Sequence, residues 1–307
     1  MSGRRGQRQR IFLTGGTGFV GRVVARRLAE RGHALRALVR HRDDGRAAGL
    51  RDLGADLVVG DITRQQTIAG ALDDCETVVH LVGIIKERPP EVTFERVHTH
   101  GTIQVVEAAR QAGVRRIVHM SALGARLDGT AYQRTKYEGE EAVRRSGISY
   151  AIMRPSVILG LGGEFTRMLL RMVRMLPFTP VIGDGQYRLQ PVDVRDVAEA
   201  IGLAVERENV PDAAWEIAGP HKLTYNRILE IISEELGFHR TRFHVPLTLV
   251  QPLVDIASNW RLPTPINSDQ LAMLLEENVI RGEGNALLDT FGIEPNSLRS
   301  IVRELSG

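Results

Sequence analysis

The chain has 307 residues, of which 43% are apolar, and a formal net charge of +3, which fits a soluble globular protein with an ample core. Its single cysteine, Cys75, excludes an internal disulfide framework and a metal site built from cysteines alone. No apolar run reaches the roughly 18 residues of a membrane-spanning helix, and the N-terminus lacks the apolar core of a secretory signal, so we expect a cytoplasmic protein.

Arginine dominates the basic residues. Only Lys86, Lys136 and Lys222 are lysines, which leaves arginine for the other 37 of the 40 basic residues. We attribute this skew to base composition and expect no nucleic-acid binding. Residues 1–9 are predicted to form a basic, flexible tail, which is solvated or touches an anionic surface.

A glycine-rich turn follows the tail. Ile11–Leu13 is typical of a short buried strand, and after it Gly15, Gly18 and Gly21 recur three residues apart before a helix that extends to about Arg31. Glycines let the backbone turn tightly and approach a pyrophosphate, which the free N–H groups of the helix start can bind. The turn therefore predicts a dinucleotide site, and the alternative is a strand–helix turn without a ligand. The candidate cofactor contacts here are Gly15, Thr17, Gly18, Phe19, Val20, Gly21 and Arg22.

Strands and helices then alternate. We expect strands at Ala34–Val39, Leu57–Val59, Thr77–Val82, Arg116–Met120 and Tyr150–Met153. Helices are expected at Thr93–Gln111 and Ala131–Arg145. This alternation predicts an α/β fold, a doubly wound parallel Rossmann sheet with helices on both faces.

The pattern changes after Arg154-Pro155. A glycine-rich loop leads to a helix around Glu164–Leu176, and residues 191–198 resemble a return to the first domain with a helix to about Glu206. We expect residues 10–158 plus about 190–206 to form an NAD(P)-binding Rossmann domain. Residues 159–189 plus 207–307 are expected to form a smaller, mainly helical substrate or partner lobe, with the active cleft between the lobes.

The end of the second strand bears on cofactor choice. An acidic residue there commonly takes the ribose hydroxyls, but this chain has Arg40. A guanidinium suits a 2′-phosphate, and Arg22 is placed to reach the same group, so NADP(H) is favoured. The alternative is that these arginines are solvated and that Asp43 or Asp44 serves the ribose of NAD(H).

Two later strand ends supply further candidate contacts. Asp61, followed by Ile62, ends the third strand, where a carboxylate can accept from the adenine amino group. The fourth strand closes with Leu81, Val82 and Gly83, where the chain must pass close to the ribose and nicotinamide.

Tyr132 and Lys136 are the candidate catalytic pair. Four residues apart, they lie on one face of a predicted helix. A tyrosine has a free pKa of about 10, and a nearby lysine cation favours its phenolate. The same lysine can hold the ribose hydroxyls of the cofactor.

With these motifs the sequence resembles the short-chain dehydrogenase/reductase superfamily, in its extended branch of epimerases and dehydratases. The resemblance covers about residues 10–300. It rests on the glycine motif, the Tyr132/Lys136 pair, Arg154-Pro155 and 192–198. Four further stretches resemble the atypical subgroup related to the nucleotide-binding accessory subunit of respiratory complex I: 80–85, 93–98, 119–125 and 265–271.

The resemblance implies an acid–base role for Tyr132, ribose anchoring by Lys136 and a cofactor contact at Pro155. Catalytic members carry Ser or Thr where this chain has Ala122, and Ser121 stands one place early as a weak polarising donor. In catalytic members an asparagine of the fourth helix holds a water relay for protons, and this chain has His98 in its place. We therefore expect a low-activity or structural cofactor binder. The alternatives are an active sugar-nucleotide epimerase, dehydratase or carbonyl reductase, and a redox-sensing regulator.

Two amphipathic stretches suggest partners. Arg167, Arg171 and Arg174 alternate with apolar residues, as in a helix that lies on a membrane surface or a respiratory complex on the inner face of the membrane. The alternative is a helix with one buried face and solvated arginines. The apolar stretch Val245–Trp260 is either core or the wall of a hydrophobic or quinone pocket. The nine histidines show no metal-ligand spacing, so no metal is expected.

Overall fold

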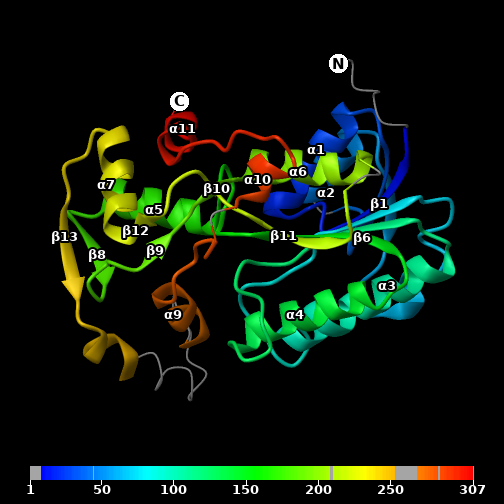
Figure 1. Ribbon diagram of the computed structural model, residues 1–307, viewed down its shortest axis with the longest axis horizontal. Coiled ribbons are helices and arrows are strands. Elements are labelled where there is room, and N and C mark those ends of the chain that lie inside the picture. Colours follow the sequence, from blue (N-terminus) through cyan, green and yellow to red (C-terminus); the bar gives the residue numbers. More distant parts are fainter. Residues whose placement is uncertain (1–7, 44, 208–209, 253–267, 283, 307) are drawn as a thin grey trace. The chain divides into compact units, whose positions relative to one another are not determined.

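The protein is described by a computed structural model that covers residues 8–43, 45–207, 210–252, 268–282 and 284–306 (Figure 1). Its chain forms two compact units. The first comprises Met1–Pro155, Val194–Ile217 and Ala286–Ile293, and the second comprises Ser156–Asp193, Ala218–Asn285 and Glu294–Gly307.

Four segments lie in a different unit from the one expected. Residues 156–158 and 190–193 belong to the second unit, and 207–217 and 286–293 belong to the first. The reason is a seventh strand, Ala213–Ile217, which extends the sheet of the first unit and contacts the short helix α10 (Ala286–Asp289). This strand is short and lacks a clear alternation of apolar and polar residues, so the sequence pattern did not predict it.

A parallel sheet of seven strands forms the centre of the first unit, in the order β11-β6-β5-β4-β1-β2-β3. The strands are β1 (Arg10–Thr14), β2 (Ala34–Val39), β3 (Asp56–Val59), β4 (Thr77–His80), β5 (Arg116–Met120), β6 (Ser149–Pro155) and β11 (Ala213–Ile217). The strands β2 and β3 lie on one side of β1, and the chain then crosses to the other side of β1 to form β4 and the strands after it. In sheets of this kind, ligands bind at the carboxyl ends of the two strands where this change occurs, here β1 and β4. The predicted doubly wound architecture is confirmed.

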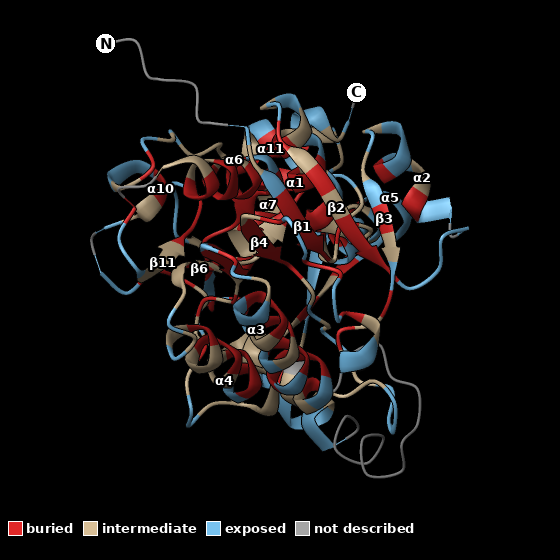
Figure 2. Ribbon diagram, turned by 90° about the vertical axis from the view of Figure 1, so that its right-hand side faces the viewer, coloured by how far each residue is buried: buried red, intermediate tan, exposed pale blue. Residues whose placement is uncertain are grey.

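Helices cover both faces of this sheet (Figures 1 and 2). The helices of the first unit are α1 (Phe19–Glu30), α2 (Gly45–Asp52), η1 (Gln65–Thr67), η2 (Glu95–His100), α3 (Gly101–Gln111), α4 (Ala131–Arg144), α6 (Val194–Glu206) and α10 (Ala286–Asp289). Helix α1 packs against α6, and α4 packs against η2 and α3 on the other face. Val20, Val24 and Leu28 recur at helical spacing and are buried, which is why α1 lies flat on the sheet.

One expected helix is interrupted. The stretch predicted as a single helix, Thr93–Gln111, begins with the π-helical turn η2 and continues as α3. A wider turn of this type often marks a functional position, and here it contains His98.

The second unit combines helices with three two-stranded sheets. The strand pairs are β7 (Ile158–Leu159) with β10 (Val192–Asp193), β8 (Phe178–Ile182) with β13 (Thr241–Val245), and β9 (Arg188–Leu189) with β12 (Leu223–Thr224). The labelled helices are α5 (Glu164–Met175), α7 (Tyr225–Glu235), α9 (Ser268–Leu275) and α11 (Leu298–Glu304). Residues 253–260 of the apolar stretch and 265–267 of the last motif lie outside the described residues. Within the described ranges, no helix is long and apolar enough to cross a membrane.

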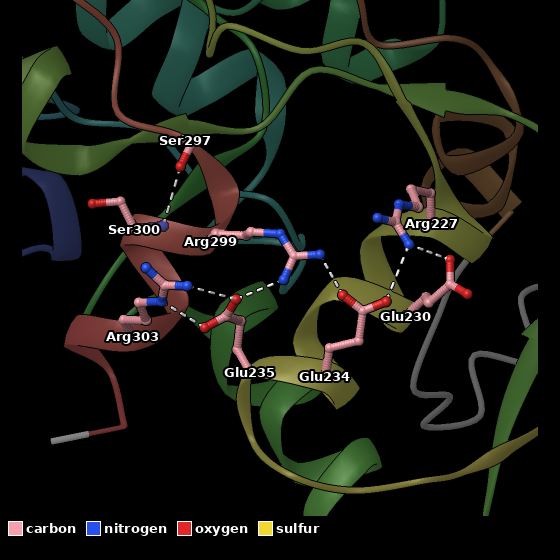
Figure 3. Close-up of polar contacts among 8 residues, drawn as sticks. All are labelled: Arg227, Glu230, Glu234, Glu235, Ser297, Arg299, Ser300 and Arg303. Carbon is pink, nitrogen blue, oxygen red and sulfur yellow. Dashed lines mark hydrogen bonds and ion pairs between the residues drawn. The ribbon is translucent and has the colours of Figure 1, made fainter.

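Ion pairs join the C-terminal helix α11 to α7 in the second unit (Figure 3). Glu235 binds Arg299 and Arg303, and Glu234 links Arg299 to Arg227. Although the Glu235 side chain is only 9% exposed, the arginines and Glu234 are 38–70% exposed, so each pair contributes little to stability. The apolar residues of α11 (Leu298, Ile301 and Val302) are buried in the core of this unit and hold the chain end more strongly.

Candidate functional site

The glycine turn at the carboxyl end of β1 has no room for side chains. Gly15 has φ +76°, and a Cβ on it would lie 2.9 Å from the backbone carbon of Leu81. A Cβ on Gly21 would lie 2.0 Å from the carbonyl oxygen of Gly15. The turn therefore packs against the end of β4, and both glycines are sterically required.

The start of α1 is suited to an anion. Gly18 occupies the N-cap, no side chain caps the helix, and its first turn holds no acidic residue. The first N–H groups of a helix lack partners within the helix and attract negative charge. Thr17 and Phe19 are half-buried beside this end, whereas Val20 is buried beneath it. A pyrophosphate fits this cradle because no side chain competes for the N–H groups.

The two arginines predicted to choose the cofactor flank the turn. Arg22 lies in the first turn of α1 and Arg40 directly follows β2, and both are exposed. Neither side chain makes a hydrogen bond or ion pair within the described part of the chain. Asp43 is exposed, and Asp44 lies outside the described residues.

The ends of β3 and β4 present different groups to a ligand. One carboxylate oxygen of Asp61 accepts from the N–H of Thr63 at 2.9 Å and from its hydroxyl at 2.8 Å. The side chain of Ile62 is buried in the core, so only its backbone is available to a ligand. Leu81 is likewise buried, Val82 is half-buried, and Gly83 is exposed.

The exposed Gly83 lies beside Lys136 of α4. A Cβ on it would lie 3.7 Å from His98 Nε2 and 3.8 Å from Lys136 Nζ, which is ordinary contact distance. The fold thus brings together the end of β4 and the predicted lysine. A nicotinamide dinucleotide fits these residues, because the glycine cradle and Gly83 leave backbone exposed along one edge of the sheet.

The predicted pair Tyr132 and Lys136 lies in the first turns of α4. Thr130 and Gln133 begin this helix with a capping box, in which each side chain bonds the backbone N–H of the other. Lys136 Nζ donates to the carbonyl oxygen of Met120 at 2.6 Å. Burial lowers the pKa of Lys136 to about 8 and raises the pKa of Tyr132 to about 12.

These pKa values change the expected role of the pair. The prediction was a phenolate favoured by a lysine cation, but burial dominates at Tyr132 and keeps its hydroxyl protonated at neutral pH. In this form Tyr132 can donate a proton.

His98 is built into the site as a structural residue. Its Nε2 accepts the N–H of Ile84 at 3.0 Å, so its Nδ1 carries the proton and donates to Thr135 Oγ1 at 3.1 Å. The ring stacks on Phe94 at 5.4 Å and meets the edge of Tyr132 at 5.4 Å. Burial, aided by the charge of Lys136, lowers the pKa of His98 to about 2. A neutral His98 therefore holds the turn after β4 in place and packs against the ring of Tyr132.

Ser121 and Pro155 occupy buried positions. Ser121 is 4% exposed, and its hydroxyl has no hydrogen-bond partner among the residues described. Ala122 is half-buried and presents only a methyl group. Pro155 is buried at the end of β6, and its carbonyl oxygen accepts from the N–H of Leu123 at 2.8 Å.

A buried hydrogen-bond chain links the two ends of the site, and the sequence did not suggest it. His80 at the end of β4 bonds Thr14 at 2.6 Å and Thr102 at 3.1 Å, and Thr102 Oγ1 donates to the carbonyl of His98 at 2.5 Å. His119 stacks on His80 with ring centroids 5.2 Å apart. The only available sequence signal was that His80 and His119 both end or nearly end apolar strands.

Glu140 was also missed. It follows Lys136 by four residues, is completely buried, and its carboxylate accepts from Arg154 at 2.8 and 2.6 Å and from Arg144 at 2.7 Å. Its charge acts on Lys136 and raises the pKa of the lysine, against the larger effect of burial. The i, i+4 spacing of Tyr132, Lys136 and Glu140 was the signal that could have found it.

A doubly wound sheet with a glycine cradle and a tyrosine–lysine helix defines a dinucleotide-binding protein of the dehydrogenase type. The chain belongs to the NAD dependent epimerase/dehydratase family, whose model matches residues 11–218. The predicted family is confirmed, and the cofactor class is a nicotinamide dinucleotide.

Two curated relatives differ in their described roles. The chain is 36% identical over 189 residues to a ceramide reductase of Caulobacter vibrioides, covering 61% of this chain and only 58% of that enzyme. It is 27% identical over 295 residues to the 40 kDa subunit of mitochondrial NADH-ubiquinone oxidoreductase of Neurospora crassa, covering 94% of this chain and 76% of the subunit. The predicted relation to complex I accessory subunits is therefore confirmed.

Solved structures agree on the fold. The UDP-glucose 4-epimerase of Thermotoga maritima, crystallised with UDP-glucose, superposes with a TM-score of 0.73 over 96% of both chains at 21% identity. At this identity the likeness establishes the architecture and not the substrate.

Proposed function

We propose that this chain binds NADP(H) in preference to NAD(H) and keeps it as a low-activity or structural cofactor. The cofactor is assigned to the first unit, and a substrate or partner to the second. The contacts proposed for it are those at the glycine turn, Arg22, Arg40, Asp61, the backbone of Ile62, residues 81–83, Tyr132, Lys136 and Pro155.

The pair of unpartnered arginines beside the glycine turn carries the NADP(H) preference. Arg22 and Arg40 are exposed, and their side chains make no hydrogen bond or ion pair within the described residues that would have to be broken to bind a phosphate. A guanidinium binds phosphate bidentately, and such charge-assisted bonds are about twice as strong as neutral ones. A 2′-phosphate can use this charge, whereas a 2′-hydroxyl gains little from it.

Three observations support low activity. The position at which catalytic members carry a hydroxyl is Ala122, and the neighbouring Ser121 hydroxyl is buried. His98 uses both ring nitrogens for structural hydrogen bonds. Groups that would polarise a substrate oxygen or relay protons are therefore weak at this site.

Calorimetry with NADPH and NADH tests the cofactor preference. We expect Arg40→Ala to weaken NADPH binding about tenfold or more, because a charge-assisted bond contributes about 1.5–3 kcal/mol, and to leave NADH binding nearly unchanged. Arg26→Ala, an exposed arginine one turn further along α1, is the matched control and should change neither affinity. Equal wild-type affinities for NADH and NADPH, unchanged by Arg40→Ala, would contradict the preference.

A carbonyl reductase is the second candidate. The protonated Tyr132 favours it, since a phenol can donate its proton to a carbonyl oxygen. A bound dihydronicotinamide would supply the hydride to the carbonyl carbon, and Lys136 would anchor its ribose. The Caulobacter relative named a ceramide reductase supports this reaction class. NADPH oxidation by the wild type with a long-chain ketone, abolished by Tyr132→Phe, would establish it; activity retained in Tyr132→Phe would remove Tyr132 from the reaction.

The relation to complex I subunits supports a partner. We propose that the chain acts in the cytoplasm, peripherally on the inner face of the membrane, in association with a respiratory complex. Affinity purification of the tagged chain from its native host should recover respiratory subunits. Recovery of none, from membranes solubilised so that the complex stays intact, would count against this partner.

A further inference from the structure

One corner of the second unit is strongly cationic. It is built from two chain segments, 165–183 and 236–252, which include β8, β13 and all of α5 except its first residue, Glu164. Glu164 and Asp184 flank the first segment, and Glu235 precedes the second. Neither segment contains an aspartate or glutamate, although the chain has 37 acidic residues. Together they carry five arginines: Arg167, Arg171, Arg174, Arg240 and Arg242.

The two strands of this corner turn an apolar face outward. β8 and β13 lie side by side in parallel, with Pro180 paired to Phe243 (Figure 1). Thr179 and Val181 point inward and are buried, so the alternate residues of β8 face outward. Phe178 is 48% and Phe243 57% exposed, and their rings meet edge to face at 5.8 Å.

Further apolar side chains extend this surface. Leu176 precedes β8, and Leu247 and Leu249 follow β13; they are 38%, 37% and 60% exposed. Isolated exposed apolar residues are normal, but two half-exposed phenylalanines in ring contact, with exposed leucines next to both strands in the chain, are typical of an interaction surface.

The arginines lie on the same two segments as the aromatic pair, and Arg242, next to Phe243 in β13, donates to the carbonyl oxygen of Asn226 at 3.1 Å. Arg240 donates to the carbonyl oxygens of Val173 and Arg174 at the end of α5, at 3.1 and 3.3 Å, which joins the two segments. Arg167, Arg171 and Arg174 are exposed on α5, whose buried face holds Leu169 and Val173. None of the five arginines forms an ion pair with a carboxylate in the described part of the chain. Their charge is therefore not neutralised by the described residues of this unit.

We propose that this surface binds a bilayer that contains anionic lipids. We call it the 178/243 face, and it comprises Phe178, Phe243, the three exposed leucines and the five arginines named above. Aromatic and leucine side chains insert at the boundary between headgroups and acyl chains, and surrounding arginines bind anionic phosphates. The unneutralised charge complements an anionic headgroup layer, and the half-exposed rings supply the apolar part. The inference stands independently of the cofactor, because all of these residues lie in the second unit.

Vesicle flotation of the full-length protein tests the proposal. The vesicles are phosphatidylcholine alone and phosphatidylcholine with phosphatidylglycerol. We expect binding to the anionic vesicles that weakens with salt. Arg171→Glu should weaken it about tenfold, since it replaces a positive charge with a negative one at the anionic surface. Phe178→Ala with Phe243→Ala should weaken binding further at high salt, where only the apolar contribution remains.

Two control variants distinguish the 178/243 face from positive charge elsewhere on the chain. Arg26→Glu makes the same change in charge at an exposed arginine of the first unit and should leave vesicle binding unchanged. Arg4→Gln, Arg5→Gln and Arg8→Gln together remove charge from the N-terminal tail and should also leave most binding intact.

Three outcomes would overturn the proposal. The wild type does not float with anionic vesicles, or both 178/243-face variants bind as well as the wild type. The third is a loss of binding in the tail variant alone. Thermal unfolding and NADPH binding should be the same in the face variants as in the wild type, which shows that they are folded.

Discussion

The glycine turn after β1 and the α4 face with Tyr132, Lys136 and Glu140 border one site but are built differently. The turn is made of backbone, and its glycines are required because a Cβ at Gly21 would overlap the carbonyl oxygen of Gly15. The α4 face is made of buried side chains, each of which depends on a partner from another element: Lys136 on Met120, and Glu140 on Arg154. A side chain added to the glycine turn should disrupt its conformation, whereas substitutions on the α4 face should change stability and pKa values by degrees.

Gly21→Ala should produce the largest effect and breaks the turn. The added methyl group would lie 2.0 Å from the Gly15 oxygen, so we expect a loss of about 3 kcal/mol in the free energy of unfolding, as in other overpacked sites. NADPH affinity should fall by at least about tenfold, because the cradle for the pyrophosphate must move. Urea unfolding and calorimetry measure the two effects.

Gly49→Ala is the matched control for this change. Gly49 lies within α2, and a Cβ there would meet nothing within 4 Å, so alanine should raise stability by up to about 1 kcal/mol. A Gly21→Ala protein that binds NADPH like the wild type would show that the turn is not the cofactor site.

Glu140→Gln should have an intermediate effect and tests the α4 face. It leaves two guanidinium groups without their buried carboxylate, so we expect a loss of about 2 kcal/mol in the free energy of unfolding. The pKa of Lys136 should fall further, since the charge of Glu140 raises it. With only three lysines in the chain, NMR titration of ¹³C-labelled lysine can follow this pKa directly.

Glu141→Gln provides the comparison on the same helix. Glu141 is partly exposed and pairs with Arg144 and Arg145, so its loss should cost at most about 0.5 kcal/mol and leave the Lys136 titration in place. An equal effect of the two substitutions on the Lys136 titration would mean that Glu140 has no specific role.

The smallest expected effect is a dependence of stability on alkaline pH. Because burial lowers the pKa of Lys136 from 10.5 to about 8, the unfolded chain binds a proton between these values that the folded chain does not. The free energy of unfolding should therefore rise by about 1 kcal/mol between pH 8 and 9. Above pH 9 the raised pKa of the buried Cys75 thiol opposes this rise, since the unfolded cysteine then loses its proton first. Above pH 10 the raised pKa of Tyr132 reverses the trend, since the unfolded tyrosine then loses its proton first.

Lys136→Met should remove this alkaline rise. The exposed Lys222, changed to Met, is the control that should keep it. Urea unfolding at pH 7.5, 8.5 and 9.5 measures both variants. A rise that persists in Lys136→Met would place its origin in another group.

The sequence predicted the fold well where periodic patterns were strong. β2 and β5 have the expected bounds, and the strand–helix alternation predicted a parallel sheet with helices on both faces. It missed β11 and the helix α2, and it merged η2 with α3, because a short strand, a weakly apolar helix and a π-helical turn leave little periodic signal. The Tyr132/Lys136 spacing was visible, but the protonated state of Tyr132 was not, since it follows from burial by distant residues.

The sequence by itself determined the glycine cradle, the doubly wound order of elements and the family. These depend on local backbone conformation and on residue spacing, both of which are written along the chain. Only the tertiary structure decided that His98 is a neutral structural residue, that Glu140 lies buried behind Lys136, and that Phe178 and Phe243 meet on one outward face. Desolvation and pairing between residues far apart in the chain produce these properties, so they exist only after the elements have packed.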